Sequence, residues 1–284
     1  MNSQWHELNI PAALAPLYLK AALRRRVTGR ELPGQGLRCW ISLEPERLQA
    51  YRQVCGFADN GLLPATYPHV LALPLQLQLL TAQDFPFPLL GLVHLANRIR
   101  LLRPMGNLSG VRISVRVDNL QAHAKGATFD LLTTLDDLLG PLWEAQSRML
   151  CRGVQLPGEP VPHMPASVDG VHEVSRWQAE RDIGRRYARV SGDCNPIHLS
   201  AWSARLFGFP QAIAHGLWTK ARTLAALGGH LPAANLEIAV DFLKPLLLPG
   251  EVRLLASAPG SSGSLQLLGN GERVHMQGNW QPIA

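Results

Sequence analysis

Residues 191–198 read Ser-Gly-Asp-Cys-Asn-Pro-Ile-His and place a carboxylate and an imidazole in one short segment. Asp193 and His198 are five positions apart, and Gly192 and Pro196 favour a turn between them. Two such groups that share one site can act together as acid and base. This chemistry suits the addition of water to, or its removal from, an activated acyl compound.

A second segment, Ala214-His215-Gly216, begins a predicted helix over residues 214–227. Backbone N–H groups at a helix N-terminus, together with the positive end of the helix dipole, can stabilise negative charge on a carbonyl oxygen. Gly216 is the expected oxyanion donor because it offers an N–H group and admits a substrate closely. The alternative is that Gly216 only permits tight packing of the helix on a sheet.

The string from Tyr187 to His198, followed by Gly208-Phe209-Pro210 and Ile213-Ala-His-Gly216, resembles the MaoC-like, R-specific enoyl-CoA hydratase family. That family has the hot-dog fold, in which an antiparallel sheet wraps a long central helix. The resemblance is strongest over about residues 175–255. It implies a hydratase or dehydratase that interconverts trans-2-enoyl and (R)-3-hydroxyacyl thioesters in fatty acid metabolism.

Within this motif, the resemblance and the residue types together assign Asp193 and His198 as the catalytic pair. Asn195 is expected to orient the catalytic loop or to bind substrate, with a pure turn role as the alternative. Cys194 is interpreted as a filler residue. Many family members carry an acidic residue shortly after the histidine, whereas this chain continues Leu199-Ser200-Ala201. We expect that departure to affect a local cap and not the chemistry.

The composition indicates a globular protein of one large or two modest domains. The chain has 284 residues, of which 46% are hydrophobic, and shows neither a long apolar run nor a signal peptide pattern. Its four cysteines are scattered without metal-ligand spacing and are expected to be free thiols in the cytoplasm. No metal and no redox cofactor is predicted, because no glycine-rich nucleotide-binding motif is present.

The net charge of +6 favours an anionic partner, such as the phosphates of coenzyme A or an acidic acyl carrier protein. Most of the excess lies in residues 1–152. Arg98 and Arg100 alternate on one predicted strand and therefore share a face, so they are candidates to bind the carrier phosphates. The alternative is that they are solubilising surface residues. No nucleic-acid-binding motif is present.

The first half of the chain repeats the plan of the second half. Tyr51-Arg-Gln-Val-Cys-Gly56 parallels Tyr187-Ala-Arg-Val-Ser-Gly192, and both halves continue with a predicted helix and several strands. The sequence therefore predicts an α+β double hot-dog protein. Its expected parts are a degenerate N-terminal domain over residues 1–151, a proline-rich linker over 152–168 and a catalytic domain over 169–284.

The alignment of the halves indicates which copy is active. Asp193 aligns with Phe57 and His198 with Leu62, so the first copy lacks the acid–base pair. Phe57 and Leu62 are instead expected to line the acyl pocket. His69 recurs at the position of His215, so His215 is left out of the predicted catalytic set.

Two other functions remain open from the sequence. One is an acyl-thioester hydrolase of the same fold, which the Asn-Pro-Ile-His string disfavours. The other is a non-catalytic subunit that binds acyl thioesters, which the intact Asp193 and His198 disfavour. In each case coenzyme A or phosphopantetheine enters as part of the substrate. The two halves are expected to form a pseudo-dimer within one chain, and two such chains can form a homodimer.

Overall fold

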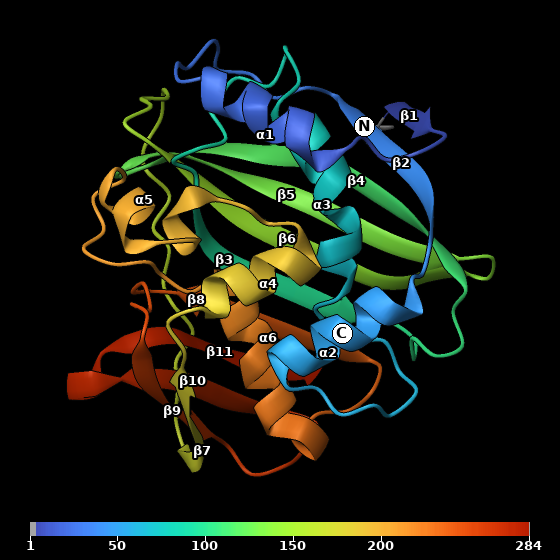
Figure 1. The fold of residues 1–284 in the computed structure, drawn as a ribbon, viewed down its shortest axis with the longest axis vertical. Coiled ribbons are helices and arrows are strands. Elements are labelled where there is room, and N and C mark those ends of the chain that lie inside the picture. The colour runs from blue at the N-terminus through green and yellow to red at the C-terminus, as the bar shows by residue number, and fades with distance from the viewer. Residues whose placement is uncertain (1–3, 284) are drawn as a thin grey trace. The chain divides into compact units, whose positions relative to one another are not determined.

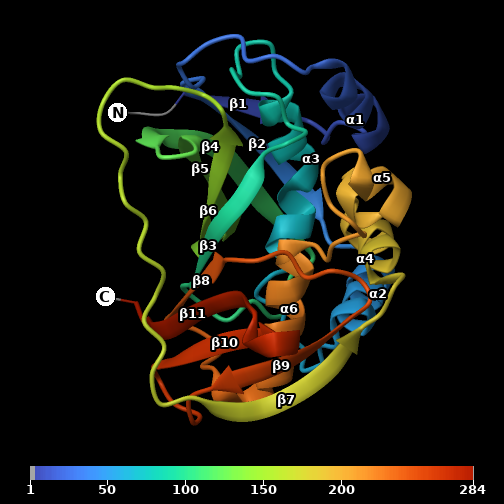
Figure 2. The same cartoon turned by 90° about the vertical axis from the view of Figure 1, so that its left-hand side faces the viewer.

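The computed structural model describes residues 4–283, which form two compact units (Figures 1 and 2). The first unit contains residues 4–43, Leu71–Asn97 and Leu108–Met164. The second unit contains Glu44–Val70, Arg98–Asn107 and residues 165–283. Each unit thus combines segments that are distant in the sequence. Among residues 4–283, no helix has both the length and the apolar composition that crossing a bilayer requires.

The first unit is a sheet, antiparallel apart from the parallel pair β1–β2, with α3 as its central helix. Its elements are β1 (Gln4–Leu8), α1 (Leu14–Leu23), β2 (Gln35–Ser42), most of α3 (Pro68–Leu80), the first part of β3 (Val93–Leu101), β4 (Gly110–His123), β5 (Gly126–Asp137) and β6 (Gly140–Arg152). Helix α3 is apolar on most sides and largely buried, as a central helix must be. The Gln76 amide on α3 donates to the Thr133 hydroxyl on β5 at 2.9 Å, which fixes the helix on the sheet.

The second unit has the same plan and carries the Asp193–His198 segment. Its elements are α2 (Pro45–Cys55), β7 (His172–Ala179), α4 (Ile183–Ser191), the 3₁₀ turn η1 (Pro196–His198), α5 (Ala201–Arg205), α6 (Gly216–Leu227), η2 (Gly228–His230), β8 (Leu236–Phe242), β9 (Gly250–Ala256), β10 (Gly263–Gly269), η3 (Asn270–Glu272) and β11 (Val274–Pro282). Helix α6 lies against the sheet of this unit (Figures 1 and 2). Its Lys220 is fully buried and donates to the Ile238 carbonyl on β8 at 3.2 Å. Burial lowers the pKa of the Lys220 amine well below its usual range.

The strand order shows the repeat directly. In the first unit the order is β2-β4-β5-β6-β3, and in the second it is β7-β9-β10-β11-β8, with corresponding strands in corresponding places. Helices α2 and α4, which contain the repeated segments ending in Gly56 and Gly192, also end alike. Both glycines are left-handed, at φ 80° and 85°. The predicted helices and predicted strands are confirmed. Strands β1 and β2 and helices α2 and α5 were not predicted.

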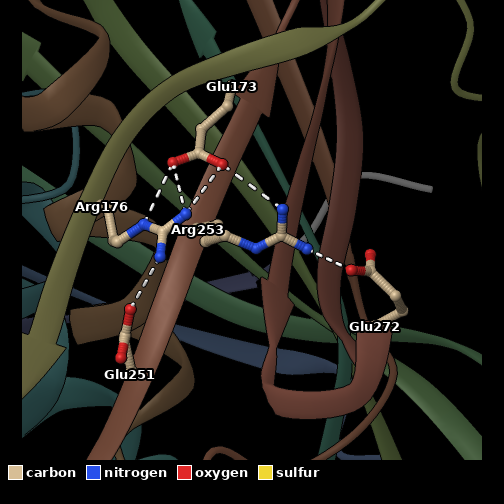
Figure 3. Close-up of polar contacts among 5 residues, drawn as sticks. All are labelled: Glu173, Arg176, Glu251, Arg253 and Glu272. Carbon is tan, nitrogen blue, oxygen red and sulfur yellow. Dashed lines mark hydrogen bonds and ion pairs between the residues drawn. The ribbon is translucent and has the colours of Figure 1, made fainter.

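The edge strand β7 is fixed to its neighbour by a network of paired charges (Figure 3). Arg176 on β7 pairs with Glu173 on the same strand and with Glu251 on β9. Arg253 on β9 pairs with Glu173 and Glu272. Every arginine of the network thus has carboxylate partners, and charged side chains on an edge strand disfavour pairing with another chain.

Candidate active site

The catalytic segment begins where helix α4 ends. Gly192 takes the left-handed conformation and donates its N–H to the Ala188 carbonyl at 2.8 Å, which closes the helix. The Ser191 hydroxyl then accepts the backbone N–H of Asp193 at 3.1 Å. The chain therefore leaves α4 in a defined direction, and the side chain of Asp193 is 34% exposed at the start of the turn.

Two side chains inside the turn hold its shape. The Asp193 carboxylate accepts the backbone N–H of Asn195 at 3.2 Å, and the Asn195 amide oxygen accepts the N–H of Ile197 at 3.4 Å. Asn195 thereby caps η1, which ends at His198. These contacts correspond to the loop-orienting role predicted for Asn195. Cys194, between these two residues, is an exposed free thiol.

Gly184 on α4 permits the backbone of η1 to approach the helix. A Cβ atom at this position would overlap the carbonyl oxygen of His198. The sequence analysis did not single out Gly184. Its signal was available, since a glycine inside a helix weakens the helix unless close packing requires it.

His198 is buried, and its tautomer is set by a backbone acceptor. Its Nδ1 lies 2.8 Å from the Ile213 carbonyl oxygen, which can only accept, so Nδ1 carries the proton. The lone pair of the neutral ring is therefore on Nε2. This is the arrangement of a general base, with one nitrogen anchored and the other available to the substrate.

The ring of His215 stacks on the ring of His198. The ring centroids are 3.7 Å apart and the planes are inclined by 28°. His215 is only 2% exposed, its Nε2 donates to the Asp193 carbonyl at 3.0 Å, and the same nitrogen is 3.8 Å from Asp193 Oδ2. Its Nδ1 is buried without a hydrogen-bond partner in the structure. His215, omitted from the predicted set, thus contacts both predicted catalytic residues.

Burial and the neighbouring ring keep both imidazoles neutral. Burial, reinforced by His215, lowers the pKa of His198 to about 3, although the nearby Asp193 acts in the opposite direction. Burial also lowers the pKa of His215. At neutral pH the site therefore contains a neutral base close to a carboxylate.

Asp193, His198 and His215 each place one ligand-type atom within 4.8 Å of the other two. A carboxylate with two imidazoles is also a donor set that divalent metals accept. However, His198 Nδ1 and His215 Nε2 already donate to the carbonyl oxygens of Ile213 and Asp193. The absence of a metal from the reaction stays a prediction.

Helix α6 begins next to this group, since His215 is its N-cap and Gly216 its first residue. The dipole of α6 therefore has its positive end beside the catalytic pair. A Cβ atom on Gly216 would lie 3.3 Å from the ring of Phe242 on β8, so the glycine also lets the helix approach the sheet closely. Both readings of Gly216 thus have a structural basis.

A row of aromatic rings connects the site to residues 57–62, the first-copy loop that follows α2. Tyr187 on α4 lies 4.9 Å from the His215 ring and 6.1 Å from Tyr51 on α2, measured between centroids. Phe57 stacks on Tyr51 at 6.3 Å. Phe57 is therefore three ring contacts from His215, at the end of this aromatic row.

The rest of the first-copy loop is held by Arg52, which is buried on α2. Its guanidinium donates to the carbonyls of Ala58 and Leu62 and lies 3.4 Å from the Asp59 carboxylate. Leu62 also forms a β-bridge with Gly106. The structure thus gives Leu62 a backbone role, and a part in an acyl pocket stays a prediction for Leu62 and Phe57.

Arg98 and Arg100 lie on β3, on the sheet face opposite to the one that holds α6. Ile99 between them is fully buried, so the arginines point the other way. Both pair with Glu237 on β8, at 3.6 Å and 3.9 Å. The structure does not bring these two candidates to the Asp193–His198 pair.

Comparisons with known proteins show the family of this chain. A model of the MaoC like domain matches residues 157–266, which include Asp193, His198 and His215. The 3-hydroxyacyl-thioester dehydratase X of Mycobacterium tuberculosis is 35% identical over 240 residues, 84% of this chain and 82% of that protein. The chain belongs to the MaoC-like dehydratase family. A 3-hydroxybutyryl-CoA dehydratase of Methylorubrum extorquens is 34% identical over 80 residues, 27% of this chain and 51% of that protein.

Solved structures show the same architecture. The crystal structure of HtdX of Mycobacterium tuberculosis matches with a TM-score of 0.76 and 30% identity, covering 87% of this chain and 100% of that one. A MaoC-like dehydratase from Phytophthora capsici matches with a TM-score of 0.72 and 20% identity, covering 90% and 96% of the two chains. The predicted double hot-dog fold of this MaoC-like protein is confirmed.

Replacing Gly184 by alanine should displace His198 and lower activity. The added Cβ must push η1 away from α4, so we expect a loss of at least about tenfold in turnover and about 1–3 kcal/mol in the free energy of unfolding. Gly229→Ala is the matched control, since its Cβ would have no neighbour within 4 Å. Equal activity of the two variants, measured with crotonyl-CoA, would show that this packing does not position His198.

Proposed function

We propose that this protein is an R-specific hydratase/dehydratase that interconverts trans-2-enoyl and (R)-3-hydroxyacyl thioesters. The observation that carries the proposal is the neutral His198, with Nδ1 anchored on Ile213 and one ring nitrogen within 4.8 Å of the Asp193 carboxylate. The names of the related dehydratases support the same reaction class. Asp193 and His198 are the catalytic residues of the proposed mechanism.

In the hydration direction, Asp193 and His198 bind one water molecule between them. His198 Nε2 accepts a proton as the water oxygen forms its bond to C3 of the enoyl thioester. The electron pair of the double bond moves towards the thioester carbonyl, and the abstracted proton is returned to C2. In the dehydration direction the pair removes the C2 proton and protonates the departing hydroxyl.

The enolate that forms between these two steps needs a stabilised oxygen. The N–H groups at the start of α6, with Gly216 first, supply hydrogen bonds and the positive end of the dipole. Because His215 joins the first residue of α6 to Asp193, the oxyanion donor and the acid–base pair belong to one rigid group.

The organisation around the site follows from the repeat. We assign residues 169–284 as the catalytic copy, 152–168 as the linker and 1–151 as the degenerate copy, with Phe57 and Leu62 towards the acyl chain. The thioester supplies its own coenzyme A or phosphopantetheine, so no separate cofactor is needed. We assign the reaction to fatty acid metabolism in the cytoplasm. The enzyme is a pseudo-dimer within one chain, or a homodimer of such chains.

Asp193→Asn and His198→Ala should each lower kcat by at least about 10²-fold, the scale expected for loss of an acid–base group. Substrate affinity should change much less. The measurement is loss of the conjugated enoyl-thioester absorbance of crotonyl-CoA, with chiral analysis of the product and a parallel assay for free thiol. A chelator should leave the wild-type rate unchanged.

The controls separate the alternatives. Asp59→Asn, in the degenerate loop, should keep nearly full activity. Release of free thiol would identify a hydrolase, and an (S)-3-hydroxyacyl product would reject the proposed stereochemistry. Full activity of Asp193→Asn would reject the catalytic assignment.

Gly216→Pro should remove the oxyanion donor while keeping the helix. Proline fits the first helical position, and His215 already has the extended backbone that must precede it, at φ −64° and ψ 136°. Gly216→Ala is the matched control, because it adds a Cβ near Phe242 but retains the N–H. We expect kcat of the proline variant to be about 10²–10³-fold below that of the alanine variant. Equal kcat values would assign Gly216 to packing alone.

A further inference from the structure

We propose that the exposed surface of α4 and α5 binds an acidic acyl carrier protein that delivers the thioester to Asp193 and His198. The proposal rests on the function proposed above and specifies the carrier of the acyl group. We call this the α4–α5 surface, and its members are Arg185, Arg186, Arg189, Trp202, Arg205, Leu206 and Phe207.

The basic part of the surface is one face of α4. Arg185, Arg186 and Arg189 are exposed, whereas the opposite face, which includes Tyr187, is buried. Arg205 on α5 is also exposed. Between residues 183 and 209 the chain contains these four arginines, no lysine and one acidic residue, Asp193 of the site itself.

These arginines lack the carboxylate partners that Arg176 and Arg253 have. Within residues 4–283, none of the four forms an ion pair; Arg185 and Arg205 donate only to the carbonyls of Leu199 and Pro210. At the β7 edge, by contrast, Arg176 and Arg253 are matched by three glutamates (Figure 3). The positive charge of the α4–α5 surface is therefore available to an anionic partner.

The apolar part of the surface lies on α5 and the two residues that follow it. Trp202 is 73% exposed, Leu206 69% and Phe207 38%. Large apolar side chains that gather on a surface mark sites of protein interaction, and tryptophan with arginine is the pair most enriched at the centres of such sites.

The surface adjoins the catalytic loop. Helix α4 leads into the catalytic loop, and α5 follows η1 along the chain. The Arg185 guanidinium contacts the Leu199 carbonyl, directly after His198, and the Ser203 hydroxyl of α5 donates to the Pro196 carbonyl of η1 at 2.7 Å. A protein bound here would hold its prosthetic group close to the site.

The combination of charge and apolar area selects among anionic partners. A second copy bound by two-fold symmetry would place the four arginines against themselves, which costs energy. Coenzyme A would pair its phosphates with arginines but leave Trp202 and Leu206 exposed. A carrier protein with an acidic helix and an apolar patch matches both parts of the surface.

The test compares three crotonyl thioesters that differ only in the carrier: acyl carrier protein, coenzyme A and pantetheine. The variants are Arg186→Gln with Arg189→Gln, and Trp202→Ser. With the carrier-protein substrate we expect KM to rise about tenfold or more and kcat to change less than about twofold. With the other two substrates KM should be unchanged. The matched control, Arg176→Gln with Arg253→Gln, removes the same charge from the paired network and should leave all KM values unchanged.

An equal rise in KM for coenzyme A would overturn the proposal and assign the arginines to phosphate binding. Unchanged KM for all three substrates would also overturn it. Two other results would overturn it as well. A loss of dimer mass in the Trp202→Ser variant, seen by sedimentation, would identify contact between copies. Binding only to anionic phospholipid vesicles would identify a lipid surface.

Binding of unacylated holo carrier protein, measured by calorimetry at low salt, requires no turnover. Wild-type protein that binds the carrier, with weaker binding in the variants, supports the docking surface even where crotonyl thioesters are not hydrated. Carrier binding without hydration of crotonyl thioesters would reject the proposed function and still support the docking surface. Wild-type protein that fails to bind would reject the docking surface.

Discussion

The stacking of His198 on His215 in a buried position is the interaction on which the rest of the site depends. Two rings whose centroids are 3.7 Å apart cannot both be charged without strong repulsion in a low-dielectric interior. Burial lowers the pKa of both imidazoles, so both stay neutral at neutral pH, and His198 is anchored through Nδ1 on Ile213. His215 in turn donates to the backbone carbonyl of Asp193, and it adds to the effect of burial in lowering the pKa of His198.

The fold supplies this contact from three elements of the second unit. Helix α4 delivers Asp193 through the left-handed Gly192, and Gly184 on the same helix allows η1 to lie against it. Helix α6 delivers His215 as its N-cap, with its dipole directed at the site. The site is thus built on the ends of helices that the sheet holds in place, which keeps the reacting groups fixed and leaves Asp193 accessible.

The sequence predicted what depends on local pattern. The turn around Asn195, the helix predicted over residues 214–227 and the duplicated plan of strands all follow from residue type and spacing, although the helix begins at Gly216. The stack of His198 on His215 was missed because it is a tertiary contact, and the recurrence of His69 argued for a structural role. The shared face of Arg98 and Arg100 was predicted correctly, but the neighbouring Glu237 depends on strand pairing between distant segments, which no local pattern reveals.

The central claim is that His198 is a neutral base at working pH, and its titration tests this most directly. The measurement is NMR of histidine side chains in isotope-labelled protein from pH 8 to pH 5, with His198→Gln to assign the signal. The account predicts that the His198 ring stays neutral with the proton on Nδ1 across this range, because burial beside His215 lowers its pKa to about 3. A His198 signal that titrates near pH 6.5, the value of an exposed histidine, would contradict it.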